Sequence, residues 1–184
     1  MRLGVYGGSF DPPHLAHVQV AARVVSDGLV DQVLVVPVHG RAFAKDLLPF
    51  TERLELCQLA FAGLDGVTVS DIERDLPTPN FTVETLLAVR TLHPAADLRL
   101  IVGADVLADL PRWHRIDEVL TLAPLLAVGR IGFNGIDVHD LALPDVASSR
   151  LRQDLRQRRD PDSPARQQLP RAVWDHIVDR GLYL

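Results

Sequence analysis

Short, almost uninterrupted apolar runs alternate along the chain with longer segments whose apolar residues recur every three or four positions. Apolar runs without alternation are typical of parallel strands that are buried on both faces. The longer segments predict amphipathic helices. The predicted strands cover Leu3–Tyr6, Val33–Val36, Val67–Ser70, Leu98–Val102 and Leu125–Val128. The predicted helices between and after them cover Leu15–Ser26, Thr51–Ala62, Thr82–Leu92 and Arg115–Leu122.

This alternation predicts an α/β fold, a doubly wound Rossmann-like parallel sheet of five strands with helices on both faces. Beyond Arg130 the pattern loosens, and two further helices are predicted at Ser148–Arg158 and Pro170–Arg180, the second ended by Gly181. Neither a repeat nor a long linker interrupts the chain. We therefore expect one domain, residues 1–184, with a C-terminal helical segment.

The composition argues against several classes of protein, namely membrane, secreted, nucleic-acid-binding and disulfide-rich proteins. The chain has 184 residues, of which 47% are hydrophobic and 23% charged, and its formal net charge is −5. No apolar run reaches the roughly 20 residues of a membrane span and no signal-peptide core is present, so a cytoplasmic protein without a membrane partner is expected. The acidic balance argues against nucleic acid as a partner. The lone Cys57 excludes a disulfide framework.

The loop after the first predicted strand carries the strongest local signal. Gly7 and Gly8 let the backbone approach a ligand closely, and the helix start that follows offers N–H groups and a positive dipole end to phosphate. His14 and His17 are three residues apart and therefore lie on one face of the first helical turn. The loop is neither a P-loop nor a GxGxxG fingerprint.

Three interpretations of this histidine pair stay open from the residue types. The pair could ligate a metal together with Asp11, it could belong to a helix start that Asp11 caps, or both imidazoles could donate hydrogen bonds to phosphate oxygens. The third interpretation uses every residue of the loop and is the one we favour. It requires no dedicated metal ligands from the protein.

Four segments, in order along the chain, resemble the signatures of the bacterial nicotinate mononucleotide adenylyltransferase family of the nucleotidyltransferase superfamily. GGSFDPPHLAH resembles GGxFDPxHxGH, FTVETL resembles YTxDTL, GADVLADLPRWHRIDEVL resembles GADxLxxLPxWxxxxEL, and ASSRLR resembles SSTxIR. The closing segment LPRAVWDHIVDRGLYL is similar to the last helix of the family. The resemblance thus extends over nearly the whole chain.

The chain departs from the family pattern at a few positions. Ala16 replaces the glycine of HxGH, Ala147 the first serine of SSTxIR, and Ser149 its threonine. The usual PPHK after the second strand is HGRAFAK, which contains Lys45, the only lysine among 19 basic residues. A coding bias toward arginine explains that scarcity. Lys45 also lies in the loop in which the family has a lysine that faces phosphate, so a role in phosphate binding is the second interpretation.

The resemblance implies transfer of AMP from ATP to nicotinate mononucleotide, with deamido-NAD and pyrophosphate as products, in NAD biosynthesis. The catalytic residues that it implies are His14, His17, Lys45 and Arg152. The implied ATP-binding residues are Gly7, Gly8, Ser9, Phe10, Gly103, Asp105, Ser148 and Ser149. The implied mononucleotide-binding residues are Thr82, Thr85, Trp113 and Arg130. Mg²⁺ is the implied cofactor, bound mainly through the ATP phosphates and not by protein ligands.

Other interpretations remain beside this one. The serines and threonines could simply cap helices, and Trp113 could belong to the core. Within the superfamily the alternative is a phosphopantetheine adenylyltransferase or another small-molecule nucleotidyltransferase. From other classes, a non-catalytic nucleotide-binding protein, a metal hydrolase or an ordinary Rossmann-like domain would fit parts of the pattern. The preference for acid or amide mononucleotide and the oligomeric state, a homo-oligomer included, stay open.

Overall fold

The structure is a computed structural model that describes residues 1–40, 47–129, 138–141, 143–157 and 162–184. Six parallel strands form one sheet in the order β3-β2-β1-β4-β5-β6. The strands are β1 Arg2–Gly8, β2 Gln32–Pro37, β3 Val67–Val69, β4 Asp97–Gly103, β5 Leu125–Gly129 and β6 Val138–Asp140. The expected fold class is confirmed, but the predicted number of five strands is wrong.

The sixth strand, β6, was not predicted from the hydrophobic pattern because it is a short edge strand. It has three residues, only one of them apolar, and pairs with β5 through Ala127 and Val138. An edge strand needs no apolar residues on both faces, so its composition resembles that of a loop.

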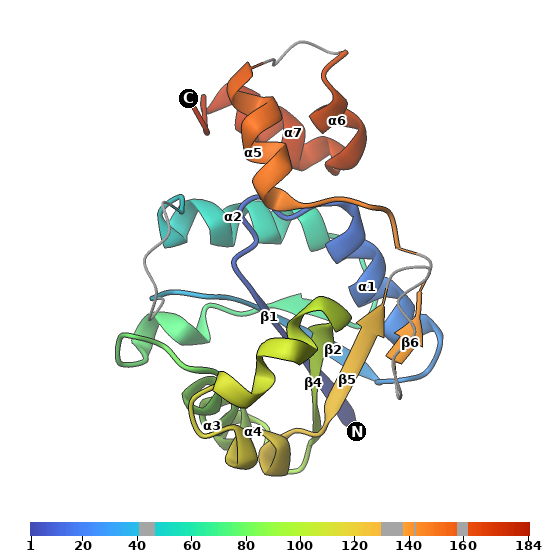
Figure 1. Cartoon of the computed structure of the whole chain (residues 1–184), viewed down its shortest axis with the longest axis vertical. Helices are drawn as coiled ribbons and strands as arrows, with labels where there is room; N and C mark the ends of the chain where they lie inside the picture. The colour runs from blue at the N-terminus through green and yellow to red at the C-terminus, as the bar shows by residue number, and fades with distance from the viewer. Residues whose placement is uncertain (41–46, 130–137, 142, 158–161) are drawn as a thin grey trace.

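Helices cover both faces of the sheet (Figure 1). One face carries α1 Leu15–Ser26 and α2 Phe50–Phe61, and the other carries α3 Thr82–Leu92 and α4 Ile116–Leu122. Two hydrophobic cores result, one on each side of the sheet. The strands β1, β2, β4 and β5 therefore face apolar side chains in both directions, as their unalternating sequences predict.

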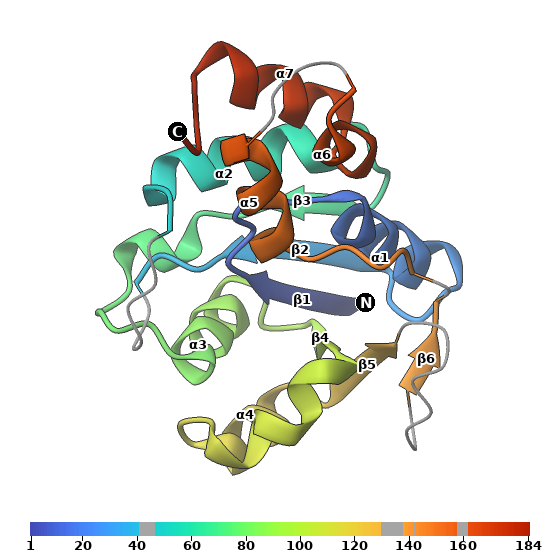
Figure 2. The same cartoon turned by 45° about the horizontal axis from the view of Figure 1, so that its top comes forward.

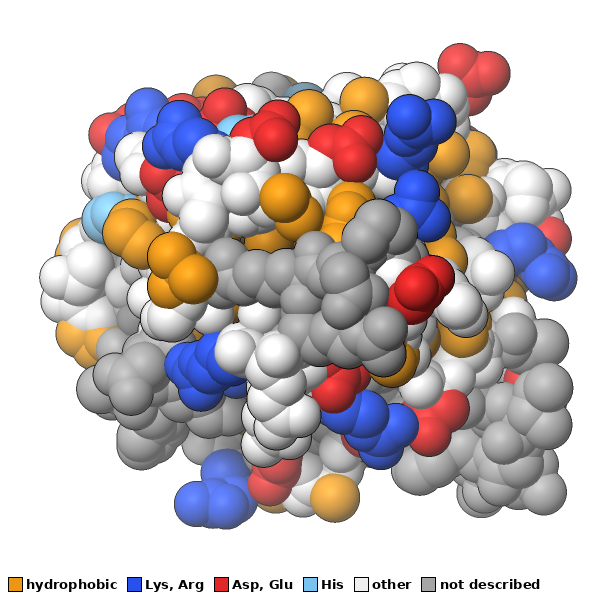
Figure 3. Space-filling view, turned by 90° about the horizontal axis from the view of Figure 1, so that it is seen from above, with side chains coloured by type: hydrophobic (Ala, Val, Ile, Leu, Met, Phe, Trp, Pro, Cys, Tyr) orange, Lys and Arg blue, Asp and Glu red, His pale blue; other side chains and the backbone are white. Residues whose placement is uncertain are grey.

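The C-terminal segment forms a third layer outside α2. It consists of α5 Ser148–Gln157, α6 Pro164–Gln168 and α7 Arg171–Asp179. Figure 2 shows α7 packed over α2 and α5 beside the end of β1. The helix α6 was not predicted, because it is a short helix that begins at a proline in a polar stretch. On the face seen from above in Figure 3, acidic and basic side chains are interspersed among the described residues.

Two 3₁₀ helices complete the described elements, at Ile72–Asp75 and Ala104–Arg112. The second follows β4 directly and contains Pro111, so its sequence lacks the pattern of an α-helix. Among the described residues, none of the helices has the length and apolar character that crossing a bilayer requires.

The strand order fixes the place where a ligand can bind. From β1 the chain proceeds outward to β3, then returns to the centre with β4 and proceeds outward in the other direction. The crevice between the carboxyl ends of β1 and β4 is therefore the topological switch point, where open α/β sheets bind ligands.

Candidate functional site

Two adjoining cavities open at the carboxyl ends of β1 and β4. One has a volume of about 490 Å³ and is lined by His14, His17 and Ser148, and we call it the histidine cavity. The other has a volume of about 660 Å³ and is lined by Phe81, Trp113 and His114, and we call it the aromatic cavity. Both share a wall formed by Tyr6, Gly7, Gly103 and Val106. The switch point thus holds room for two ligands side by side.

The histidine pair lies at the first turn of α1. His14 is the N-cap residue and is 4% exposed. Its backbone N–H donates to Nδ1 of His17 at 3.2 Å. Because Nδ1 of His17 accepts this bond, the proton of the neutral ring resides on Nε2, so that Nε2–H is a donor. The sequence alternative in which Asp11 caps the helix is wrong.

The buried ring of Phe10 packs against His17 of the histidine pair. Phe10 has a φ of 47°, in the left-handed region, and its side chain is 2% exposed. Its ring lies edge-on to those of His17 at 5.0 Å and Tyr6 at 5.5 Å between centroids. A Cβ at Gly8 would lie 3.0 Å from the Phe10 ring, so a side chain there would press on the ring and require it to move. Phe10 was predicted to contact ATP, but it packs in the core and lines neither cavity.

The turn before His14 is held by the C-terminal segment. The Arg152 guanidinium donates to the carbonyl of Asp11 at 2.6 Å, and the Ser148 hydroxyl donates to the carbonyl of Pro12 at 3.0 Å. The Tyr183 hydroxyl donates to Oδ1 of Asp11 at 2.7 Å. Ser148 lines the histidine cavity. Arg152 and Ser149, which were predicted to bind the phosphates of ATP, line neither cavity. Three residues of the C-terminal segment, all more than 130 positions away in sequence, thereby hold this turn.

Asp105 lines the histidine cavity from the first turn of the 3₁₀ helix Ala104–Arg112, which follows β4. A Cβ on Gly103 would collide with Oδ1 of Asp105. The absence of a side chain at position 103 therefore lets the carboxylate fold back over the end of β4.

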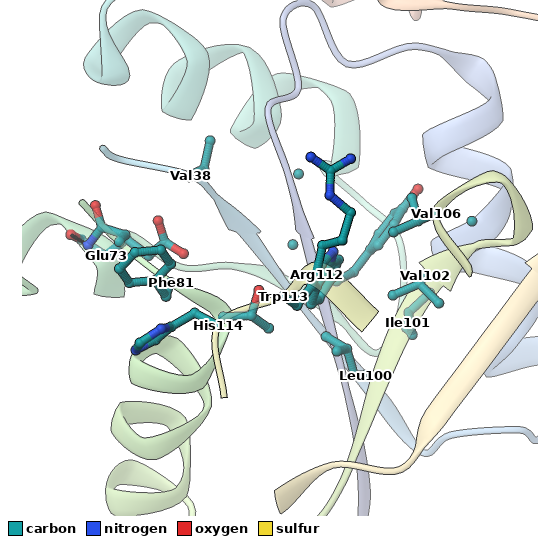
Figure 4. A pocket seen from close by; sticks show the side chains of 16 residues that line it. Val38, Glu73, Phe81, Leu100, Ile101, Val102, Val106, Arg112, Trp113 and His114 are labelled. Carbon is teal, nitrogen blue, oxygen red and sulfur yellow. Dashed lines mark hydrogen bonds between the residues drawn. The ribbon is translucent and has the colours of Figure 1, made fainter. Parts of the chain in front are cut away.

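Aromatic side chains form one wall of the aromatic cavity. The rings of Phe81 and His114 lie 4.4 Å apart between centroids. Figure 4 shows Trp113 and Arg112 between this pair and Val106 in the view drawn. Thr82, at the start of α3, lines the cavity as well. His114 is exposed, and its ring lines this cavity beside that of Phe81. In the sequence, only its position next to Trp113 indicates this.

Glu73 places a buried carboxylate at the edge of the aromatic cavity. It is 7% exposed and accepts hydrogen bonds from the Thr85 hydroxyl at 2.7 Å and the His39 backbone N–H at 2.8 Å. Burial raises the pKa of this carboxyl above its usual value, and the two hydrogen bonds oppose that shift. Thr85, predicted to contact the ligand, is buried, does not line the cavity and holds Glu73 instead.

Arg53 was not singled out in the sequence, yet it connects the loops around the site. Its side chain is 2% exposed, and its guanidinium donates to three carbonyls. The acceptors are Ser9 at 2.9 Å after β1, Val38 at 2.7 Å after β2, and Leu48 at 2.9 Å before α2. Ser9, a predicted ATP contact, lines neither cavity and contributes this carbonyl.

Within the described ranges, one group of three side chains could hold a metal ion, Glu52, Glu55 and His176. It lies between α2 and α7 and lines neither cavity. Two predicted site residues, Lys45 and Arg130, lie outside the described residues.

Comparison with known proteins identifies the family. Residues 5–154 match the cytidylyltransferase-like family. A probable nicotinate-nucleotide adenylyltransferase of Anaeromyxobacter dehalogenans is 36% identical over 185 residues, which cover 99% of this chain and 96% of that protein. A protein of the same name from Streptococcus pyogenes is 33% identical over 189 residues, which cover 99% and 88%.

Solved structures share the fold. The Plasmodium falciparum nicotinic acid mononucleotide adenylyltransferase complexed with NaAD matches with a TM-score of 0.78 and 18% identity, over 99% of this chain and 97% of that one. A putative nicotinate-nucleotide adenylyltransferase from Vibrio parahaemolyticus matches with a TM-score of 0.75 and 22% identity, over 100% and 96%. At such identities the structural match speaks for the fold alone.

Proposed function

The chain belongs to the cytidylyltransferase-like family and, within it, to the nicotinate-nucleotide adenylyltransferases, and from this premise we propose how its two cavities work. The enzyme transfers AMP from ATP to nicotinate mononucleotide and releases pyrophosphate, a step of NAD biosynthesis. The observation that carries this assignment is the pair of adjoining cavities with a common wall at Gly7 and Gly103. The transfer of a group from one substrate to another requires two adjacent binding cavities of this kind.

The histidine cavity receives ATP. It contains the start of α1, where the positive end of the helix dipole favours phosphate. Asp105 and the backbone at Gly103 suit the ribose or adenine at the switch point. The absence of a side chain at Gly7 leaves the shared wall open, since nothing lies within 4 Å of a Cβ built there.

The aromatic cavity receives the mononucleotide. The rings of Phe81, Trp113 and His114 offer flat apolar surfaces to a pyridine ring. Thr82 and the first N–H groups of α3 offer donors to its carboxylate. The mononucleotide phosphate then faces the common wall, toward ATP. Thr85 acts through Glu73 in this proposal and not by direct contact.

The reaction needs no protein nucleophile. A phosphate oxygen of the mononucleotide attacks the α-phosphorus of ATP, the bond from that phosphorus to the bridging oxygen breaks, and pyrophosphate leaves. Nε2–H of His17 donates to the α-phosphate as charge builds on it, while His14 holds the neighbouring phosphate. Catalysis is thus mainly alignment of the two substrates and stabilisation of charge.

Magnesium fits this arrangement. Asp105 is the one carboxylate among the described residues that line the histidine cavity, and a hard oxygen beside phosphates suits Mg²⁺. Bound through the triphosphate, the ion would neutralise charge on the phosphate oxygens. Asp105 would hold one of its waters.

Arg152, Ser148 and Ser149 form the proposed grip on the leaving pyrophosphate at the start of α5. Arg152 donates to the Asp11 carbonyl, so it can serve this role only by sharing its guanidinium between the loop and the phosphate. Lys45 and Arg130 stay predictions from the sequence, as further cations for the triphosphate and the acceptor phosphate.

The direct test is incubation of the purified protein with ATP, Mg²⁺ and either nicotinate mononucleotide or its amide. Formation of deamido-NAD together with pyrophosphate is expected, with the acid preferred. ATP binding without turnover of either acceptor would instead favour a non-catalytic nucleotide-binding protein. The names of the relatives reported above give no support to a phosphopantetheine acceptor.

A further inference from the structure

Asp11 is a buried carboxylate that the reaction does not use. Its side chain is 0% exposed, and it lines neither cavity. A buried carboxylate is costly unless it is hydrogen-bonded or paired. Oδ1 accepts the Tyr183 hydroxyl at 2.7 Å, and Oδ2 lies 3.7 Å from Nη1 of Arg152. The position of this side chain is therefore set by two residues of the C-terminal segment.

The end of α7 directs Tyr183 into this position. Gly181 has a φ of 60°, its N–H donates to the Val178 carbonyl at 3.2 Å, and the Leu182 N–H donates to the Ile177 carbonyl at 3.0 Å. These two bonds form a Schellman motif, which ends the helix and turns the chain back. Tyr183 then enters the core and is 7% exposed.

The Tyr183 hydroxyl is a permanent donor in this bond. Burial raises the pKa of the phenol well above its ordinary value, and the neighbouring Asp11 carboxylate raises it further. The phenol therefore keeps its proton throughout the pH range in which an enzyme works. A donor on a carboxylate also gives the stronger, charge-assisted type of hydrogen bond.

The position of Asp11 in turn determines the positions of the two histidines. Only Pro12 and Pro13 separate it from His14, and the Pro12 carbonyl is held by Ser148. Since proline fixes one backbone dihedral, the segment from Asp11 to His14 has little freedom to absorb a displacement. A shift of Asp11 would consequently move the His14 ring and, through the bond between the two histidines, that of His17.

We propose that Tyr183 is a positioning residue for adenylyl transfer, which holds the Asp11 carboxylate and thereby keeps His14 and His17 aligned on the phosphates. This role rests on the proposed function for its effect on turnover, but the placement of the histidines can be measured without turnover. The substitution Tyr183→Phe removes one oxygen and leaves the packing of the ring in place. It leaves Oδ1 of Asp11 without its donor.

The experiment compares Tyr183→Phe with Ile177→Val, a control in the same segment whose fully buried side chain has no polar atom and lines neither cavity. Both variants are expected to lower the melting temperature. Only Tyr183→Phe is expected to reduce kcat, by about 10-fold or more, with KM for both substrates changed by less than about 3-fold, because misaligned histidines weaken charge stabilisation in the transition state.

A double-mutant cycle identifies the path. If Tyr183 acts through Asp11, Tyr183→Phe combined with Asp11→Asn should reduce kcat no further than the more damaging single substitution. Additive losses, or a kcat of Tyr183→Phe equal to that of the wild type at a temperature where both are folded, would overturn the proposal.

Imidazole NMR signals supply the readout that does not depend on turnover. The signals of His14 and His17 should move in Tyr183→Phe and stay in place in Ile177→Val. Unmoved signals in Tyr183→Phe would overturn the positioning role even if the wild type turned over no substrate. Moved signals with an inactive wild type would instead contradict the proposed function alone.

Discussion

The rings of His14 and His17 stack on each other, with 3.7 Å between their centroids and 18° between their planes. Two positive charges at this distance would repel each other. A phosphate between or beside the rings relieves the repulsion. The stacked pair therefore suits an anionic ligand in the histidine cavity.

The first prediction concerns His17. Replacement by Ala removes both the acceptor of the His14 N–H and the donor at Nε2. We expect kcat to fall by about 100- to 1000-fold, the usual loss when one donor to a developing negative charge is removed. Steady-state kinetics with ATP and nicotinate mononucleotide measure this loss.

His139 in β6 provides the control for that variant, since it lines neither cavity. The substitution His139→Ala should leave kcat within about 2-fold of the wild type, as is usual for a surface position. Equal kinetics for both variants would contradict the role given to His17.

The second prediction assigns Asp105 to ATP. Asp105→Ala should raise KM for ATP by about 10- to 100-fold, the range for a lost hydrogen bond to a charged group. Gly103→Ala should act in the same direction, because the added Cβ displaces the Asp105 carboxylate. If that is its cause, the double variant is no worse than Asp105→Ala alone. A further loss in the double variant would show that Gly103 acts independently of Asp105.

The third prediction separates the two cavities. Trp113→Leu should raise KM for the mononucleotide by about 10-fold and leave KM for ATP unchanged, since Trp113 lines only the aromatic cavity. The second tryptophan, Trp174, lies in α7 and lines neither cavity, so Trp174→Phe should change neither KM. A larger effect of Trp113→Leu on ATP than on the mononucleotide would reverse the assignment of the cavities.

How far the sequence alone predicts this molecule depends on which interactions hold each part. The buried strands β1 and β4 were found to within two residues because both faces are covered with apolar side chains. Tyr183 carried no such signal, since its partner Asp11 is 172 positions away. Pairing over that distance is visible only in the folded chain.

Arg53 is intermediate: its burial can be predicted from the sequence, but its hydrogen-bond partners cannot. It shares a helix face with Cys57 and Ala60, both buried, so an arginine at that spacing indicates a guanidinium inside the core. The pattern did not reveal its three carbonyl acceptors. Those acceptors lie after β1, after β2 and before α2, and their meeting depends on the pairing of β1 with β2 in the sheet.

The fourth prediction concerns the stability that Arg53 provides. Arg53→Met leaves three carbonyls without their donors and should lower the free energy of unfolding by about 3 to 5 kcal/mol. Urea unfolding measures this change. Arg150→Met is the matched control, because that side chain is 60% exposed and its ion pair with Asp145 spans 3.7 Å. A loss at Arg53 as small as the one at Arg150 would contradict the role of the buried guanidinium.

The fifth prediction follows from Glu73. Its pKa in the folded protein lies above the ordinary 4.5, so the folded state binds the proton more tightly than the unfolded state does. Its contribution to stability is therefore full below the ordinary pKa and is lost as pH rises through the raised one. Urea unfolding across this range should show a decline in wild-type stability that Glu73→Gln lacks. Parallel pH profiles for the two proteins would contradict the raised pKa.

The central claim is that a phosphate oxygen of the mononucleotide attacks the α-phosphorus of ATP between the two cavities. Incubation with ATP labelled at the α-phosphate tests it most directly. The account predicts that the label appears in deamido-NAD in one-to-one ratio with the mononucleotide consumed, and that pyrophosphate carries none. Label released as free AMP, or label that stays in ATP while the mononucleotide is bound, would contradict it.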